Sequence, residues 1–85
     1  MSRQVPWNKV VLEEFIEIGG LTKIEEQVMR TRVAGWSRVE QSMKFGLSLA
    51  TIDRIIARCK RKYDNCQPYS PLLPPRRKSD NDIHL

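Results

Sequence analysis

The feature that most constrains the fold of this chain is a three-residue break at residues 46–48, Gly-Leu-Ser, between two segments with helical signals. Glycine supplies the positive φ that ends one helix, and serine supplies the oxygen that caps the next. Two helices joined by so short a turn cross at a steep angle. We therefore predict a helix-turn-helix, with the small Ser42 at the crossing and Leu47, Ile52 and Ile55 holding the second helix on the first.

The sequence predicts an all-α fold, a small domain of four helices. Their expected ranges are 8–18, 23–34, 38–45 and 49–64. A Ser or Thr followed three residues later by Glu predicts a capping box before the second and third helices, and glycines follow the first three. Apolar residues at spacings of three and four predict one buried face per helix. The expected inward residues are Val11, Leu12, Phe15, Ile16 and Ile18, then Ile24, Val28 and Met29, then Val39, Ser42, Met43 and Phe45, and finally Ile52, Ile55, Ile56, Cys59 and Tyr63.

The chain changes character after the fourth helix. Prolines at 68, 71, 74 and 75 forbid regular helix, and the last residues are polar. We therefore divide the chain into an N-terminal arm (1–7), a helix-turn-helix domain (8–65) and a disordered or extended proline-rich tail (66–85). Leu72 and Leu73 are exceptions to this polar character, and either anchor a partner or pack back on the domain.

The positive charge is concentrated in one segment. The net charge of the chain is +5, and residues 36–63 hold seven basic and two acidic residues, which accounts for all of it. The flanking segments 1–35 and 64–85 are each balanced, with five of each sign and three of each sign. A local excess of cations is what binding a phosphate backbone requires, because each cation placed on a phosphate releases counterions. A solvated basic helix would carry the same excess.

Catalysis, metal binding and membrane insertion are not expected. The one histidine, His84, stands in the predicted tail, where a nucleophile–base pair would lack fixed geometry. Cys59 and Cys66 lack the further ligands that a zinc site needs, so we expect a buried and an exposed thiol. The sequence has no membrane-spanning apolar run and no apolar stretch typical of a secretory signal at its start. We expect a cytoplasmic, non-enzymatic protein without a cofactor.

Residues 21–62 resemble the helix-turn-helix module shared by LuxR-type regulators and region four of bacterial sigma factors. The matching pieces are Leu21-Thr22, Glu25, Val28-Met29, Gly35-Trp36-Ser37, Gly46-Leu47-Ser48, Thr51-Ile52, Ile56 and Lys62. The resemblance implies a bacterial or phage transcription regulator whose recognition helix, residues 49–64, enters the major groove of double-stranded DNA. Prolines stand where LuxR-type modules carry a dimerisation helix, so the sigma region-four version fits better.

The recognition helix supplies most of the candidate DNA contacts. Near its start, Arg54 suits a guanine, Ala50 a thymine methyl, and Asp53 either a cytosine or the orientation of Arg54. Ser48 and Thr51 suit phosphates, helped by the free N–H groups of the helix start. The remaining cations are expected on the DNA backbone: Arg38, Lys44, Arg58 and Arg61.

The alternative is a protein-interaction module without specific DNA reading. The acidic outer side of the first helix, with Glu13, Glu14 and Glu17, would suit docking on RNA polymerase or another transcription protein. Residues 71–76 also have the PxxPxR form that aromatic-lined grooves recognise. The sequence leaves open the operator, the direction of regulation and the oligomeric state.

Overall fold

The computed structural model of the chain describes residues 7–75, in which all regular secondary structure is helical and no strand occurs. Four α-helices follow one another: α1 (Lys9–Ile18), α2 (Lys23–Val33), α3 (Arg38–Phe45) and α4 (Leu49–Cys66). A short 3-10 helix, η1 (Gln67–Tyr69), follows directly. The predicted all-α, four-helix character is therefore confirmed, with helix ends within two residues of those expected. The first six residues of the predicted arm, His84, and the arginine of the PxxPxR pattern lie outside the described residues.

Each helix begins at a side chain that accepts a hydrogen bond from a backbone N–H three residues along the chain. Thr22 Oγ1 accepts from Glu25 N (3.3 Å) and Glu25 Oε1 accepts from Thr22 N (2.9 Å), which completes a capping box. Ser37 and Glu40 form the same box at the start of α3. Asn8, which the sequence placed inside the first helix, is its cap instead. These local bonds explain why the helix starts could be predicted from residue types alone.

Glycines mark the ends of the first three helices, in two different ways. Gly20, Gly35 and Gly46 have positive φ, which other residues adopt only at a cost. Gly19 has an ordinary φ of −77°, but a Cβ there would lie 2.6 Å from the Phe15 carbonyl oxygen. Space rather than backbone angle therefore restricts Gly19.

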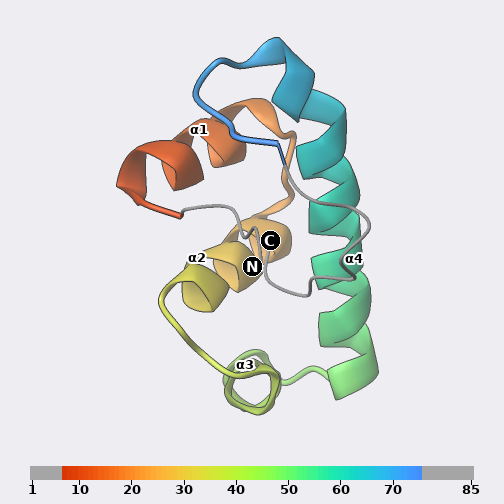
Figure 1. The fold of residues 1–85 in the computed structure, drawn as a ribbon. Helices are drawn as coiled ribbons and strands as arrows, with labels where there is room; N and C mark the ends of the chain where they lie inside the picture. Colours follow the sequence, from red (N-terminus) through yellow and green to blue (C-terminus); the bar gives the residue numbers. More distant parts are fainter. Residues whose placement is uncertain (1–6, 76–85) are drawn as a thin grey trace, which may run out of the picture.

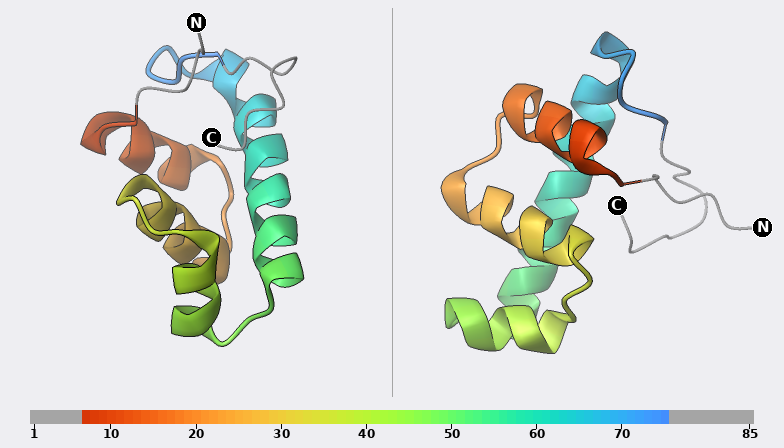
Figure 2. Two further views of the ribbon diagram at one scale, coloured as in Figure 1. Left: turned by 60° about the horizontal axis from the view of Figure 1, so that its bottom comes forward. Right: turned by 90° about the vertical axis from the view of Figure 1, so that its left-hand side faces the viewer.

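Helix α4 is the axis on which the other helices pack. In Figure 1 it runs the length of the molecule, with α1, α2 and α3 following one another along one side. Both views of Figure 2 show α3 and α4 joined by the short connection 46–48, and the right-hand view shows that the two helices lie at a steep angle. At one end of the core, the Trp7, Phe15 and Tyr63 rings meet with centroids 5.2–6.0 Å apart. The buried apolar residues from 11 to 63 are Val11, Leu12, Phe15, Val28, Met29, Ile52, Ile55, Ile56, Cys59 and Tyr63.

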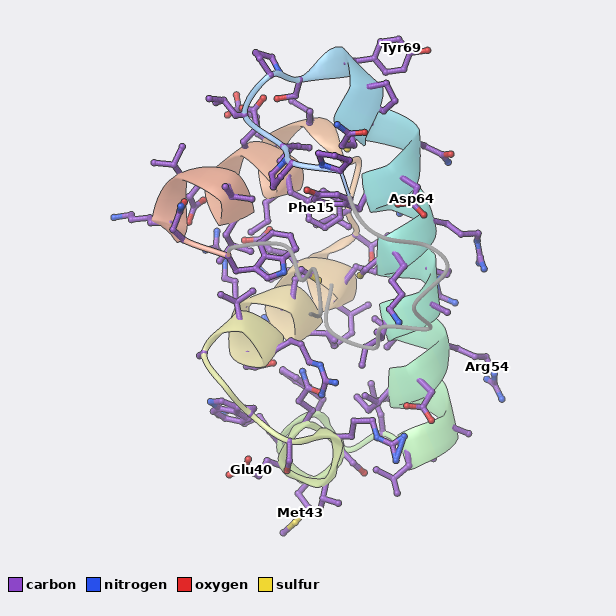
Figure 3. The ribbon with its side chains drawn as sticks, viewed as in Figure 1. Phe15, Glu40, Met43, Arg54, Asp64 and Tyr69 are labelled. Atoms are coloured by element: carbon purple, nitrogen blue, oxygen red, sulfur yellow. The ribbon has the colours of Figure 1, made fainter. Side chains whose placement is uncertain are left out.

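Helix α3 presents a different face to the core from the one expected. Val39 and Met43 were predicted to point inward, but they are 56% and 79% exposed. In Figure 3, Met43 points away from the body of the molecule. The inward position belongs to Gln41, which is fully buried and donates through Nε2 to the Val28 carbonyl and Thr31 Oγ1, each at 2.9 Å. A polar side chain displaced the apolar face because the end of α2 offers these two acceptors.

A similar correction applies to Ile18, which was assigned to the apolar face of the first helix but is 40% exposed. The helix ends there, and the chain turns through Gly19 before any neighbour covers its last residue. Ser42, expected at the close crossing, is partly buried and donates from Oγ to the Leu47 carbonyl.

The segment predicted as a disordered or extended tail is folded over residues 66–75. Cys66 is the last residue of α4, and Leu73 is one of the buried residues of the hydrophobic core. Two polar bonds fasten this segment: Tyr63 Oη donates to the Pro74 carbonyl, and Ser70 Oγ donates to Glu14 Oε2 at 2.6 Å. Prolines exclude a helix here but not a turn, so the interpretation of 66–75 is corrected; residues 76–85 lie outside the described residues.

None of the helices in residues 7–75 is both long and apolar enough to cross a membrane.

Candidate nucleic-acid interface

One side of α4 faces away from the rest of the domain. Ala50, Arg54, Ala57 and Arg61 follow one another at spacings of four, three and four, opposite the buried stripe, and all are exposed. We call these four residues the outer face of α4. Arg54 and Arg61 make no hydrogen bond or ion pair among residues 7–75, and Figure 3 shows Arg54 pointing away from the body of the molecule. The outer face is thus a row of two unpaired guanidinium groups separated by small side chains.

Arg58, predicted to contact the DNA backbone, is paired with a residue of α2. Its Nε donates to Glu25 Oε2 at 3.1 Å, and Lys62 Nζ lies 2.5 Å from Glu25 Oε1. Glu25 is only 2% exposed. Burial alone would raise the pKa of its carboxyl, but hydrogen bonds from Lys62, the Thr22 N–H and Arg58 outweigh burial and lower the pKa to about 2. The structure therefore gives Arg58 a role in joining α2 to α4.

Asp53 is paired with Arg38 and not with Arg54. Arg38 Nη1 lies 2.9 Å from both carboxylate oxygens, so the start of α3 is bridged to the first turns of α4. Both side chains remain about half exposed. The predicted roles of Asp53, orienting Arg54 or accepting from a cytosine, find no support in this arrangement, whereas Arg38 stays close to the outer face.

The start of α4 uses its hydroxyl groups locally. Ser48 Oγ accepts from Thr51 N (3.1 Å) and lies 3.0 Å from Thr51 Oγ1. The N–H groups of Leu49 and Ala50 have no acceptor among residues 7–75, as expected for the first turn of a helix. Lys44 is exposed in the last turn of α3. The first turn of α4 therefore offers free backbone donors, while its hydroxyl groups are occupied by capping.

Sequence reasoning missed a hollow of about 520 Å³ beside the outer face. The residues that line it are Arg32, Arg38, Asp53, Ile56, Ala57 and Lys60. Arg32 lies at the end of α2, in the half of the chain whose charges balance, so the charge count gave no signal for it. Lys60 was counted in the basic segment but given no role. The fold alone brings these cations together.

The part of the chain that the structure describes holds no cluster of three or more His, Cys, Asp or Glu side chains placed to bind a metal ion. Comparison with protein-family models, with curated proteins and with solved structures finds no match to this chain.

Proposed function

We propose that this chain binds double-stranded DNA. In this proposal α3, residues 46–48 and α4 form a helix-turn-helix, and α4 lies in the major groove as the recognition helix. The short connection, the positive φ of Gly46 and the steep crossing of the two helices support it.

The outer face of α4 is the observation that carries the proposal. Its two arginines, Arg54 and Arg61, have no carboxylate partner among residues 7–75, whereas Arg30, Arg38 and Arg58 are each paired with a carboxylate. Ala50 and Ala57 leave the helix narrow beside them, so that it can enter a groove. Arg54 lies nearer the start of α4, where recognition helices approach base edges, and Arg61 lies further along, where phosphates are closer.

The charge distribution agrees with this assignment. All of the net charge of the chain falls in residues 36–63, which comprise α3 and most of α4. We propose that the chain acts as a small transcription regulator of bacterial or phage type, similar to region four of sigma factors. The proposed function includes no catalytic activity.

Selection of bound sequences from a random duplex pool tests this proposal. An enriched motif would support sequence reading, and its symmetry would report whether one or two copies bind. Recovery of the input pool without enrichment would exclude sequence-specific binding.

Arg54→Ala then tests the assigned base contact. We expect a loss of about 1–3 kcal/mol on the selected site and little change on random duplex, whereas Arg61→Ala weakens all sequences alike. Equal losses on selected and random duplex in both variants would show that Arg54 does not read a base.

A second candidate function is docking on a transcription protein such as RNA polymerase. Val39 and Met43 lie one turn apart on the exposed side of α3, and Leu49 at the start of α4 is also partly exposed. An exposed apolar pair on a short helix is typical of a protein contact. Absence of duplex binding at low salt, together with co-purification of polymerase that Met43→Lys abolishes, would favour this function.

A further inference from the structure

We infer that the hollow beside the outer face of α4, called the basic hollow from here on, binds one phosphate group, held by Arg32 and Arg38. The backbone of the duplex is the source of that phosphate, and this part of the inference rests on the proposed function. The hollow lies where the end of α2, the start of α3 and the middle of α4 meet. Its walls carry the cations Arg32, Arg38 and Lys60 against the single carboxylate of Asp53.

Arg32 provides the first argument. Its Nε is buried and has no hydrogen-bond partner in the described structure. A buried donor without an acceptor is costly, so such a group marks a place where an acceptor binds. A guanidinium presents its N–H groups in a plane that matches phosphate oxygens, and bonds of this charged kind are the stronger ones.

Asp53 provides the second argument. Both of its carboxylate oxygens accept hydrogen bonds from Arg38 Nη1, each at 2.9 Å, at the edge of the hollow. A carboxylate in this position occupies Arg38 as an incoming phosphate would. The pair is about half exposed, so solvent weakens it and Arg38 is able to exchange one anion for another. Asp53 therefore acts as an internal competitor for the phosphate.

The position of the hollow agrees with a phosphate from the duplex backbone. Ala57 belongs both to the outer face and to the lining of the hollow, so the two surfaces adjoin. When α4 lies in a groove, a surface beside its outer face meets one of the two flanking backbones. A phosphate bound there would fix the register of α4 along the DNA without reading sequence.

Titration of the full chain, labelled with ¹⁵N, with inorganic phosphate tests the site directly. Ionic strength is held constant with chloride, and the Nε–H signals of Arg32 and Arg38 and the backbone amide of Ala57 are followed. We expect a saturable shift of these signals. Arg32→Gln should lower the phosphate affinity at least about fivefold, since one charge-assisted hydrogen bond is lost. Arg38→Gln, at a half-exposed position, should lower the phosphate affinity by a similar factor. It replaces Arg32→Gln in the titration if that variant does not fold.

Two further variants test the role of Asp53 and provide a charge control for the titration. Asp53→Asn removes the competitor and should tighten phosphate binding. Lys23→Gln removes one positive charge from an exposed position outside the hollow and should leave the titration unchanged. Equal titrations of the wild type, Arg32→Gln and Arg38→Gln, or shifts spread over the whole surface, would overturn the site.

A random 16-base-pair duplex then identifies the source of the phosphate. If the backbone supplies it, Arg32→Gln weakens duplex binding about 3- to 10-fold on every sequence. Duplex binding that Arg32→Gln leaves unchanged, beside a positive phosphate titration, would overturn the duplex as the source and leave a site for a free phosphate. Absence of duplex binding by the wild type would overturn the proposed function, while the phosphate titration would still decide on the hollow.

Discussion

Glu25 is the residue that most clearly joins local and tertiary structure. One of its oxygens closes the capping box of α2 on the Thr22 N–H, and both oxygens receive cations from α4. The sequence predicted the capping box because both partners are three residues apart. It could not predict the ion pairs, since Arg58 and Lys62 lie more than thirty residues away along the chain. A basic side chain that sequence reasoning assigned to DNA is therefore used by the fold.

Stability should depend on pH through Glu25. Its folded pKa of about 2 lies below the ordinary 4.5, so its stabilising effect is complete above about pH 4.5 and is lost as the pH falls towards 2. We expect urea unfolding at pH 7 to show Glu25→Gln about 2–3 kcal/mol less stable than the wild type. The difference between the two proteins should shrink steadily below pH 4.5. A difference that stays constant down to pH 2 would contradict the buried ion pairs.

The two cysteines should differ in reactivity. Burial, with the nearby Glu25 charge, raises the pKa of the Cys59 thiol to about 12, whereas Cys66 is only partly buried. Because the thiolate is the reactive form, a disulfide reagent at pH 8 should modify Cys66 in the native protein and leave Cys59 unmodified. Cys66→Ser should remove the reaction, which urea then restores. Reaction of native Cys66→Ser at the rate of a free thiol would show that Cys59 is not in the core.

At the scale of elements, helix starts and ends were predictable and helix faces were less so. Caps and glycines act on residues three or four positions away, so Ser37, Ser48 and Gly46 could be placed from residue types. The inward face of α3 depends on the hydrogen-bond acceptors of α2. Because Gln41 donates to the Val28 carbonyl, Gln41 faces inward and Val39 is exposed. The same reason explains residues 66–75, where prolines gave the local signal and the burial of Leu73 came from distant contacts.

The segment after α4 offers a matched pair of neighbouring leucines. Leu73 is 2% exposed and Leu72 is 49% exposed. We expect Leu73→Ala to lower the free energy of unfolding by about 2–3 kcal/mol, since it leaves a cavity in the core. Leu72→Ala should change it by less than about 0.5 kcal/mol. Equal small effects in urea unfolding followed by circular dichroism would mean that residues 70–75 do not pack on the helices.

At the scale of the whole molecule, the fold separates two groups of cations. Arg30, Arg58 and Lys62 are bound to carboxylates that join helices together. Arg54 and Arg61 are left on the outer face of α4, with the basic hollow beside them. The charge count predicted that the basic segment binds a polyanion, but only the structure shows which cations are already engaged. We propose that the two unpaired arginines of the outer face, Arg54 and Arg61, bind duplex DNA.

The dependence of duplex affinity on salt tests whether the outer face of α4 binds the duplex. Fluorescence anisotropy of a random duplex should show that log affinity falls steeply with log salt concentration. The slope should be roughly −0.9 for each phosphate that the protein neutralises. The double variant Arg54→Gln/Arg61→Gln should bind more weakly at every salt concentration, with a slope shallower by about 1–2. Lys9→Gln/Lys23→Gln removes the same charge from exposed positions on α1 and α2, and should leave affinity and slope close to those of the wild type. Equal losses in the two double variants would mean that net charge alone attracts DNA, and would contradict binding through the outer face of α4.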